Sequence, residues 1–135
     1  VHARMAGFDT HEGHKWRHDE LMARLDVALD GFLLKMQEYG MAERVLVATS
    51  SEFGRRVRQN GSGFDHGNAS TMLLFGPVVP ARYGQAPSLT DLDAFGNLKT
   101  TVPFDVYLGT LAQTWLGVEA GTVLPSAPET LPIIA

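Results

Sequence analysis

Three short polar clusters carry the side chains that could do chemistry in this chain. They are Asp9-Thr10-His11, Glu52-Phe53-Gly54-Arg55-Arg56 and Asp65-His66. Carboxylates and imidazoles are zinc ligands, and carboxylate-rich sites also accept manganese, calcium or magnesium. We therefore expect a divalent-metal site, with zinc as the first choice of ion.

The first cluster offers a carboxylate and an imidazole two positions apart. In an extended loop, the side chains of Asp9 and His11 point to the same side. His14 adds a third candidate ligand, whereas His18 falls on the helix that follows and is expected to be structural or exposed. The plainer interpretation of an Asp-x-His sequence is turn chemistry, and the sequence leaves both open.

The second cluster follows an apolar run. Glu52 is a candidate metal ligand or general base, or else a carboxylate paired with one of the two arginines after it. Arg55 and Arg56 could hold a phosphate or sulfate, because guanidinium groups match the oxygens of such anions. The alternative is a pair of solvated charges.

The third cluster lies in a glycine-rich loop. Asp65 and His66 again combine an acid with an imidazole, and Asn68 could support them by hydrogen bonding. Both are candidate metal ligands, and the alternative is once more a turn.

An α/β fold would position these clusters. Residues 16–39 carry an apolar stripe at helical spacing, and Gly40 ends the helix. Residues 44–49 and 71–75 are short apolar runs typical of buried parallel strands. In open α/β sheets, sites lie beyond the carboxyl ends of the strands, so such a sheet could bring the clusters together.

The rest of the chain is less regular. Residues 77–102 should form a long excursion with little secondary structure, and a helix should run from Pro103 at its first position to Gly117. The tail, which carries Pro125, Pro128 and Pro132, should be extended on the surface. We expect one domain over residues 1–135.

Composition excludes several classes of protein. The chain has 135 residues, of which 44% are hydrophobic and 19% charged, as in a globular domain. Its net charge of -4, with one small arginine cluster, argues against a nucleic-acid binder. The absence of cysteine excludes disulfides, zinc–thiolate sites and thiol nucleophiles. No apolar run reaches the roughly 18 residues that a membrane span needs.

Taken in order, three segments resemble the bacterial family known as domain of unknown function 1501. These segments are Gly7-Phe8-Asp9-Thr10-His11, Ser51-Glu52-Phe53-Gly54-Arg55 and Asp65-His66-Gly67. That family is similar to the alkaline-phosphatase and sulfatase superfamily. The resemblance implies a partial three-layer α/β/α sandwich with a mostly parallel sheet. It also implies that the chain is the C-terminal portion of such a domain, with the nucleophile upstream of Val1.

The resemblance also implies roles for particular residues. Asp9 would be the early metal ligand with His11 or His14 as its partner, and His66 would be the late histidine ligand. Glu52 stands at the carboxylate position after the strand, followed by Phe53 where the superfamily has a histidine, so one metal is expected rather than two.

The implied function is hydrolysis of a phosphate or sulfate ester by the intact protein. Glu52 would act as ligand or base, and Arg55 would bind the anion. The chain on its own is expected to be inactive, exported to the periplasm or cell exterior, and able to self-associate through exposed sheet edges. The competing hypothesis is a non-catalytic binding or scaffold module. The third hypothesis, ranked last, is a structural domain with accidental histidine clustering.

Overall fold

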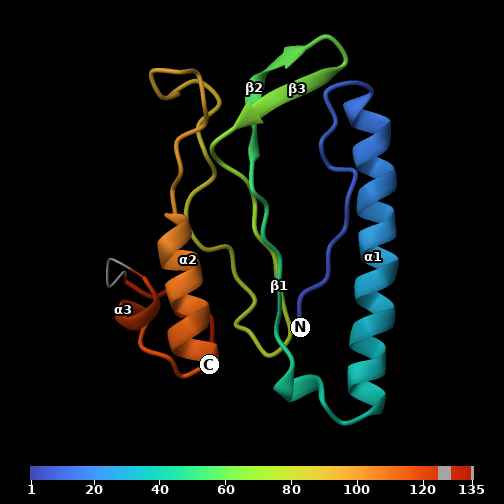
Figure 1. The fold of residues 1–135 in the computed structure, drawn as a ribbon, viewed down its shortest axis with the longest axis vertical. Helices are drawn as coiled ribbons and strands as arrows, with labels where there is room; N and C mark the ends of the chain where they lie inside the picture. Colours follow the sequence, from blue (N-terminus) through green and yellow to red (C-terminus); the bar gives the residue numbers. More distant parts are fainter. Residues whose placement is uncertain (125–128, 135) are drawn as a thin grey trace.

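The computed structural model describes residues 1–124 and 129–134, and Figure 1 shows three parts side by side. A long helix lies on one side, an extended ribbon runs up the middle, and short helices lie on the other side. In chain order the elements are α1 (His14–Glu38), the 3₁₀ turn η1 (Ala42–Arg44), β1 (Val47–Ala48), β2 (Gly54–Asn60), β3 (Gly63–Gly67), β4 (Leu74–Phe75), α2 (Phe104–Thr110), the π-helical turn η2 (Leu111–Trp115) and α3 (Ala120–Val123).

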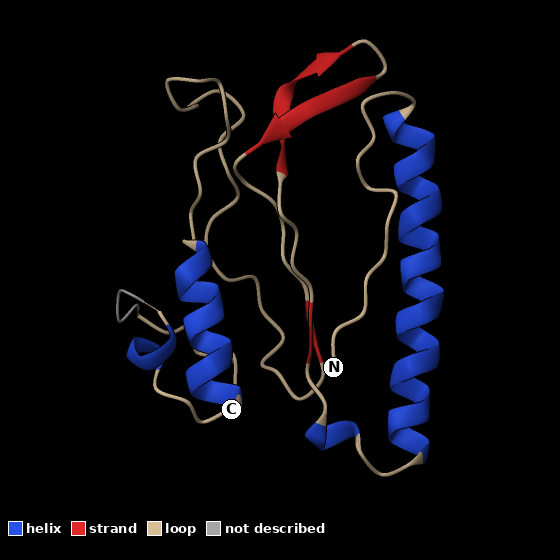
Figure 2. Cartoon of the chain, in the orientation of Figure 1, coloured by secondary structure: helices blue, strands red, loops and turns tan. Residues whose placement is uncertain are grey.

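The expectation of a three-layer sandwich with a mostly parallel sheet is wrong. Both sheets in the described part of the chain have two strands, and both are antiparallel. In one, β1 pairs with β4, and Val47 lies opposite Phe75. In the other, β2 pairs with β3, and Arg55 lies opposite His66. Figure 2 shows that these strands are parts of one ribbon that rises and returns beside itself.

A two-residue turn explains why β2 and β3 are antiparallel. Parallel neighbours need a crossover connection, whereas a chain that reverses in two residues returns antiparallel. The reversal is at Gly61-Ser62, between the paired residues Asn60 and Gly63. Gly61 has φ 60°, the positive φ that a tight hairpin turn requires at this position. The expected strands at 44–49 and 71–75 exist only as the short pair β1 and β4.

The helix expected over residues 16–39 is confirmed as α1. It ends because Gly40 adopts φ 66° and two backbone N–H groups turn back on the last turn. Gly40 N–H donates to Gln37 O at 3.0 Å, and Met41 N–H donates to Met36 O at 2.7 Å. This is the Schellman arrangement, which satisfies carbonyls that would otherwise lack partners.

A long side chain joins the C-terminal elements to the ribbon. Tyr107 on α2 is buried and donates its hydroxyl to Thr49 O at 2.7 Å, which joins α2 to the end of β1. Pro103 lies just before α2 rather than at its first position. Residues 77–102 are irregular apart from one bridge between Leu92 and Leu98, as expected.

The tail is only partly described. Pro125 and Pro128 lie outside the described residues. Pro132 is exposed, but Ile133 N–H donates to Leu131 O at 2.8 Å across it, so the chain turns there rather than being extended, and Ile133 is 1% exposed and belongs to the core. Within the described residues, no helix is both long enough and apolar enough to cross a membrane.

The buried core is small for the length of the chain. The accessible surface is 9652 Å², whereas a folded monomer of this mass is expected to expose about 6,900 Å². Large apolar side chains such as Val27, Leu34 and Phe95 are exposed. The chain therefore presents apolar surface that its own elements do not cover.

Candidate metal centre

Three side chains from two distant segments meet beside the β2–β3 hairpin. Asp9 Oδ1 lies 2.8 Å from His66 Nε2 and 3.1 Å from His11 Nε2. The two Nε2 atoms are 3.2 Å apart. Three atoms with lone pairs thus form a nearly equilateral triangle, although Asp9 and His66 are 57 positions apart in the sequence.

The donor set and the spacing fit a metal ion. Two imidazoles and a carboxylate are a known ligand set of catalytic zinc sites, which keep a further position open. In a tetrahedral zinc site, ligand atoms lie about 3.3 Å apart, close to the distances in this triangle. Roughly half of each side chain is exposed, at 60% for Asp9, 49% for His11 and 45% for His66, so a small ligand could reach the open side.

Electrostatics keep the carboxylate of this group ionised. The hydrogen bond from His66 lowers the pKa of Asp9, and the nearby His66, His11 and Arg55 add smaller effects in the same direction. Desolvation opposes them without reversing the shift. An ionised carboxylate is the form that binds a cation.

The hairpin turn holds the loop that carries Asp9 and His11. Gly13 N–H donates to Ser62 Oγ at 2.9 Å, and His14 N–H donates to Ser62 O at 2.9 Å. These N–H groups belong to the start of α1, where backbone donors lack partners within the helix. The turn therefore caps the helix and fixes the loop in front of it.

Aromatic stacking on the face of its imidazole ring orients His66. The ring of Phe53 stacks on the ring of His66 with centroids 4.0 Å apart and planes 6° from parallel. The guanidinium of Arg55 lies 4.9 Å from the centroid of the Phe53 ring. This stack restricts rotation of the imidazole, so that Nε2 stays directed at Asp9.

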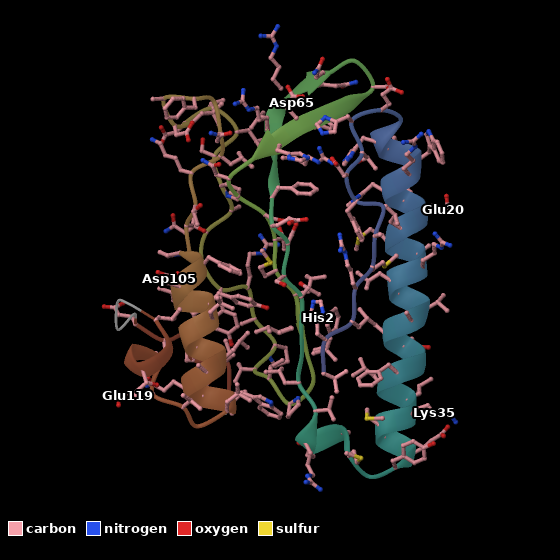
Figure 3. The ribbon with its side chains drawn as sticks, in the orientation of Figure 1. His2, Glu20, Lys35, Asp65, Asp105 and Glu119 are labelled. Atoms are coloured by element: carbon pink, nitrogen blue, oxygen red, sulfur yellow. The ribbon has the colours of Figure 1, made fainter. Side chains whose placement is uncertain are left out.

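Asp65 lies near the Nδ1 atom of His11 and is not part of the triangle. Its Oδ1 is 3.7 Å from His11 Nδ1, the nitrogen that does not face the centre, and accepts a hydrogen bond from Asn60 Nδ2 at 3.1 Å. Figure 3 labels Asp65 on the hairpin. A carboxylate behind a histidine ligand commonly orients the ring.

Two other predicted ligands do not join the group. His14 Nδ1 forms a hydrogen bond with Thr10 Oγ1 at 2.5 Å, and its ring stacks on His18. Burial, followed by the charges of His18 and Arg55, lowers the pKa of His14. Glu52 is exposed and forms no hydrogen bond or ion pair with the described residues, so its roles as ligand and base remain predictions.

The two arginines have different surroundings. Arg55 is largely buried and donates to the carbonyls of Phe8 and Phe64. Arg56 is exposed on the other side of the strand. The anion-binding role expected for Arg55 remains a prediction.

Three residues that support the site were not predicted from the sequence. They are Phe53, which stacks on His66, Ser62, which caps α1, and Thr10, which is 1% exposed and bonds His14. The sequence did hold one signal. Gly-Ser between two short runs is typical of a two-residue hairpin turn, and it would have placed Ser62 opposite the start of the helix.

Comparison with known proteins identifies the family. The family described as "Protein of unknown function (DUF1501)" matches residues 1–106, a stretch that contains Asp9, His11 and His66. No curated protein and no solved structure matches the chain. Since the match covers most of the sequence, the chain belongs to the DUF1501 family.

Proposed function

We propose that Asp9, His11 and His66 bind a divalent metal ion, with zinc as the first choice, in a protein that hydrolyses phosphate or sulfate esters. The observation that carries the proposal is the convergence of one carboxylate oxygen and two imidazole nitrogens within 3.2 Å of one another. These three residues are among the metal-ligand candidates that the sequence resemblance implies, which also include His14 and Glu52.

A cation explains this convergence better than hydrogen bonding alone. Asp9 Oδ1 can accept a hydrogen bond from each ring, but two N–H groups would then crowd together at nitrogens 3.2 Å apart. A metal ion instead accepts a lone pair from each of the three atoms.

The chain's own residues would hold and orient the ion. Asp9, His11 and His66 would bind it, and Asp65 would orient the His11 ring. A bound metal would supply Lewis acidity to an oxygen of a phosphate or sulfate ester. The open side of the triangle leaves room for a small anionic substrate, and resemblance to the alkaline-phosphatase superfamily supports this substrate class. It also supports an exported protein.

Elemental analysis of the protein purified without chelators tests the metal site. We expect about one ion per chain in the wild type and loss of that ion in Asp9→Ala and His66→Ala. His2→Ala is the matched control, because His2 is an exposed histidine outside the group. Absence of bound ion after addition of zinc or manganese, or equal binding by all four proteins, would contradict the proposal.

A non-catalytic binding module is the second candidate. Two observations support this candidate. The ring of Phe53 stacks on the face of the His66 ring, and Glu52 stays outside the triangle. The described residues therefore assemble one ligand group and not two. Metal-loaded protein that hydrolyses neither aryl phosphates nor aryl sulfates would favour this candidate.

A further inference from the structure

We propose that Arg55 is a positioning residue, which holds the loop that carries Asp9 at the correct distance from the strand that carries His66. The inference rests on the proposed metal centre. It differs from the anion-binding role expected from the sequence, in which the guanidinium would face a substrate.

The guanidinium connects the two ligand-bearing segments. Arg55 Nη2 donates to Phe8 O at 2.8 Å, and Arg55 Nη1 donates to Phe64 O. Phe8 directly precedes Asp9, and Phe64 lies two residues before His66. The donors therefore tie the backbone beside each ligand to the same rigid group.

The same side chain also supports the imidazole. The guanidinium lies 4.9 Å from the Phe53 ring centroid, and Phe53 stacks on His66. The Arg55 side chain is 18% exposed, so little of it faces solvent. Its position, the backbone of the loop and the orientation of His66 are thus linked.

Charge alone predicts the opposite effect on metal binding. Arg55 Nη2 is 3.7 Å from Asp9 Oδ1, so its positive charge repels a cation bound there. If Arg55 acted only through its charge, its removal would strengthen metal binding. If Arg55 positions the ligands, its removal weakens metal binding, so the sign of the change separates the two.

Lysine at this position separates charge from geometry. The planar guanidinium can donate to two carbonyls at once, whereas an ammonium is a compact point charge on a flexible stem. Arg55→Lys keeps the charge and loses the two-point connection. Arg56→Ala is the matched control, because Arg56 is the adjacent arginine and is exposed.

The test is titration with Co²⁺, followed by visible absorption, and competition with Zn²⁺. We expect both metals to bind about 10–100-fold more weakly to Arg55→Ala and Arg55→Lys, with an altered cobalt spectrum. Arg56→Ala should match the wild type. Unchanged or tighter metal binding by Arg55→Ala would overturn the inference. So would a variant that keeps its metal affinity and loses only its affinity for added inorganic phosphate.

A second measurement needs no metal. In the presence of EDTA, amide hydrogen exchange at Thr10 and His14 should be faster in Arg55→Lys than in Arg56→Ala, because the loop loses its connection to the hairpin. Equal exchange in the two variants would overturn the inference. If the wild type binds no cobalt while Arg55→Lys still speeds exchange, the metal centre fails and the positioning of the loop by Arg55 stands.

Discussion

Replacement of Gly63 by alanine should damage both the fold and the candidate metal centre. Gly63 begins β3 and lies directly against the loop that carries His11. A Cβ added to Gly63 would lie 2.0 Å from His11 O and 2.2 Å from His11 C. Both of these are backbone atoms, so a change of side-chain rotamer cannot relieve the clash.

The size of the effect follows from these distances. Real Cβ atoms essentially never approach a heavy atom within 3.0 Å, so the two backbones must separate by about 1 Å. Metal–ligand distances in well-formed sites fall within about 0.2 Å of their standard values. We expect zinc affinity to fall by at least roughly tenfold, as it does when the surroundings of a ligand are disturbed. Strain of this kind should lower the free energy of unfolding by about 1–3 kcal/mol.

Gly31→Ala is the matched control. Gly31 is exposed within α1, and an added Cβ would have nothing within 4 Å. Alanine in a helix interior should raise the free energy of unfolding by about 0.5–1 kcal/mol and leave zinc binding unchanged. Urea unfolding in EDTA, followed by circular dichroism, measures stability, and zinc titration measures affinity. Wild-type stability and zinc affinity in Gly63→Ala would refute the close contact between β3 and the His11 loop.

Three further predictions concern other parts of the chain. Because the pKa of His14 is lowered in the fold, the unfolded chain takes up a proton first as pH falls below about 6.5. Stability in EDTA should therefore decline from pH 7 to pH 5, and His14→Gln should flatten this decline in urea midpoints. Tyr107→Phe removes the hydrogen bond to Thr49 O and should cost about 1–3 kcal/mol of unfolding free energy. The uncovered apolar surface should cause self-association, seen as a sedimentation coefficient that rises with protein concentration.

A specific result would contradict each of these three predictions. An equal pH dependence in His14→Gln and the wild type would assign the decline to other groups. A neutral Tyr107→Phe would show that the joint between α2 and the ribbon contributes little. A constant sedimentation coefficient, equal to that of a monomer at all concentrations, would show that the exposed apolar side chains do not drive association.

Local patterns predicted the parts of the fold that depend on nearby residues. The apolar stripe and Gly40 predicted α1, because helical hydrogen bonds and the Schellman ending join residues at most five apart. The irregular stretch over 77–102 was likewise predicted from its glycine, proline and aspartate content. The short apolar runs predicted strands, but they did not predict which strands pair, since pairing joins residues far apart in the sequence.

The direction of the ribbon decided which predicted residues come together. The parallel sheet expected from the sequence would have brought Glu52 together with Asp9 and His66. The turn at Gly61-Ser62 reverses the chain instead, so the segment through Glu52 continues into the hairpin and leaves its carboxylate in solvent.

The sequence by itself determined the chemistry available to this protein: the carboxylates and imidazoles, the absence of thiols, the long helix and the family. Only the tertiary structure decided that Asp9, His11 and His66 form one group while His14 turns away to Thr10. The physical reason is distance along the chain. The position of His66 relative to Asp9 depends on contacts across 57 residues, through Arg55, Phe53 and the hairpin turn, and no local pattern encodes them.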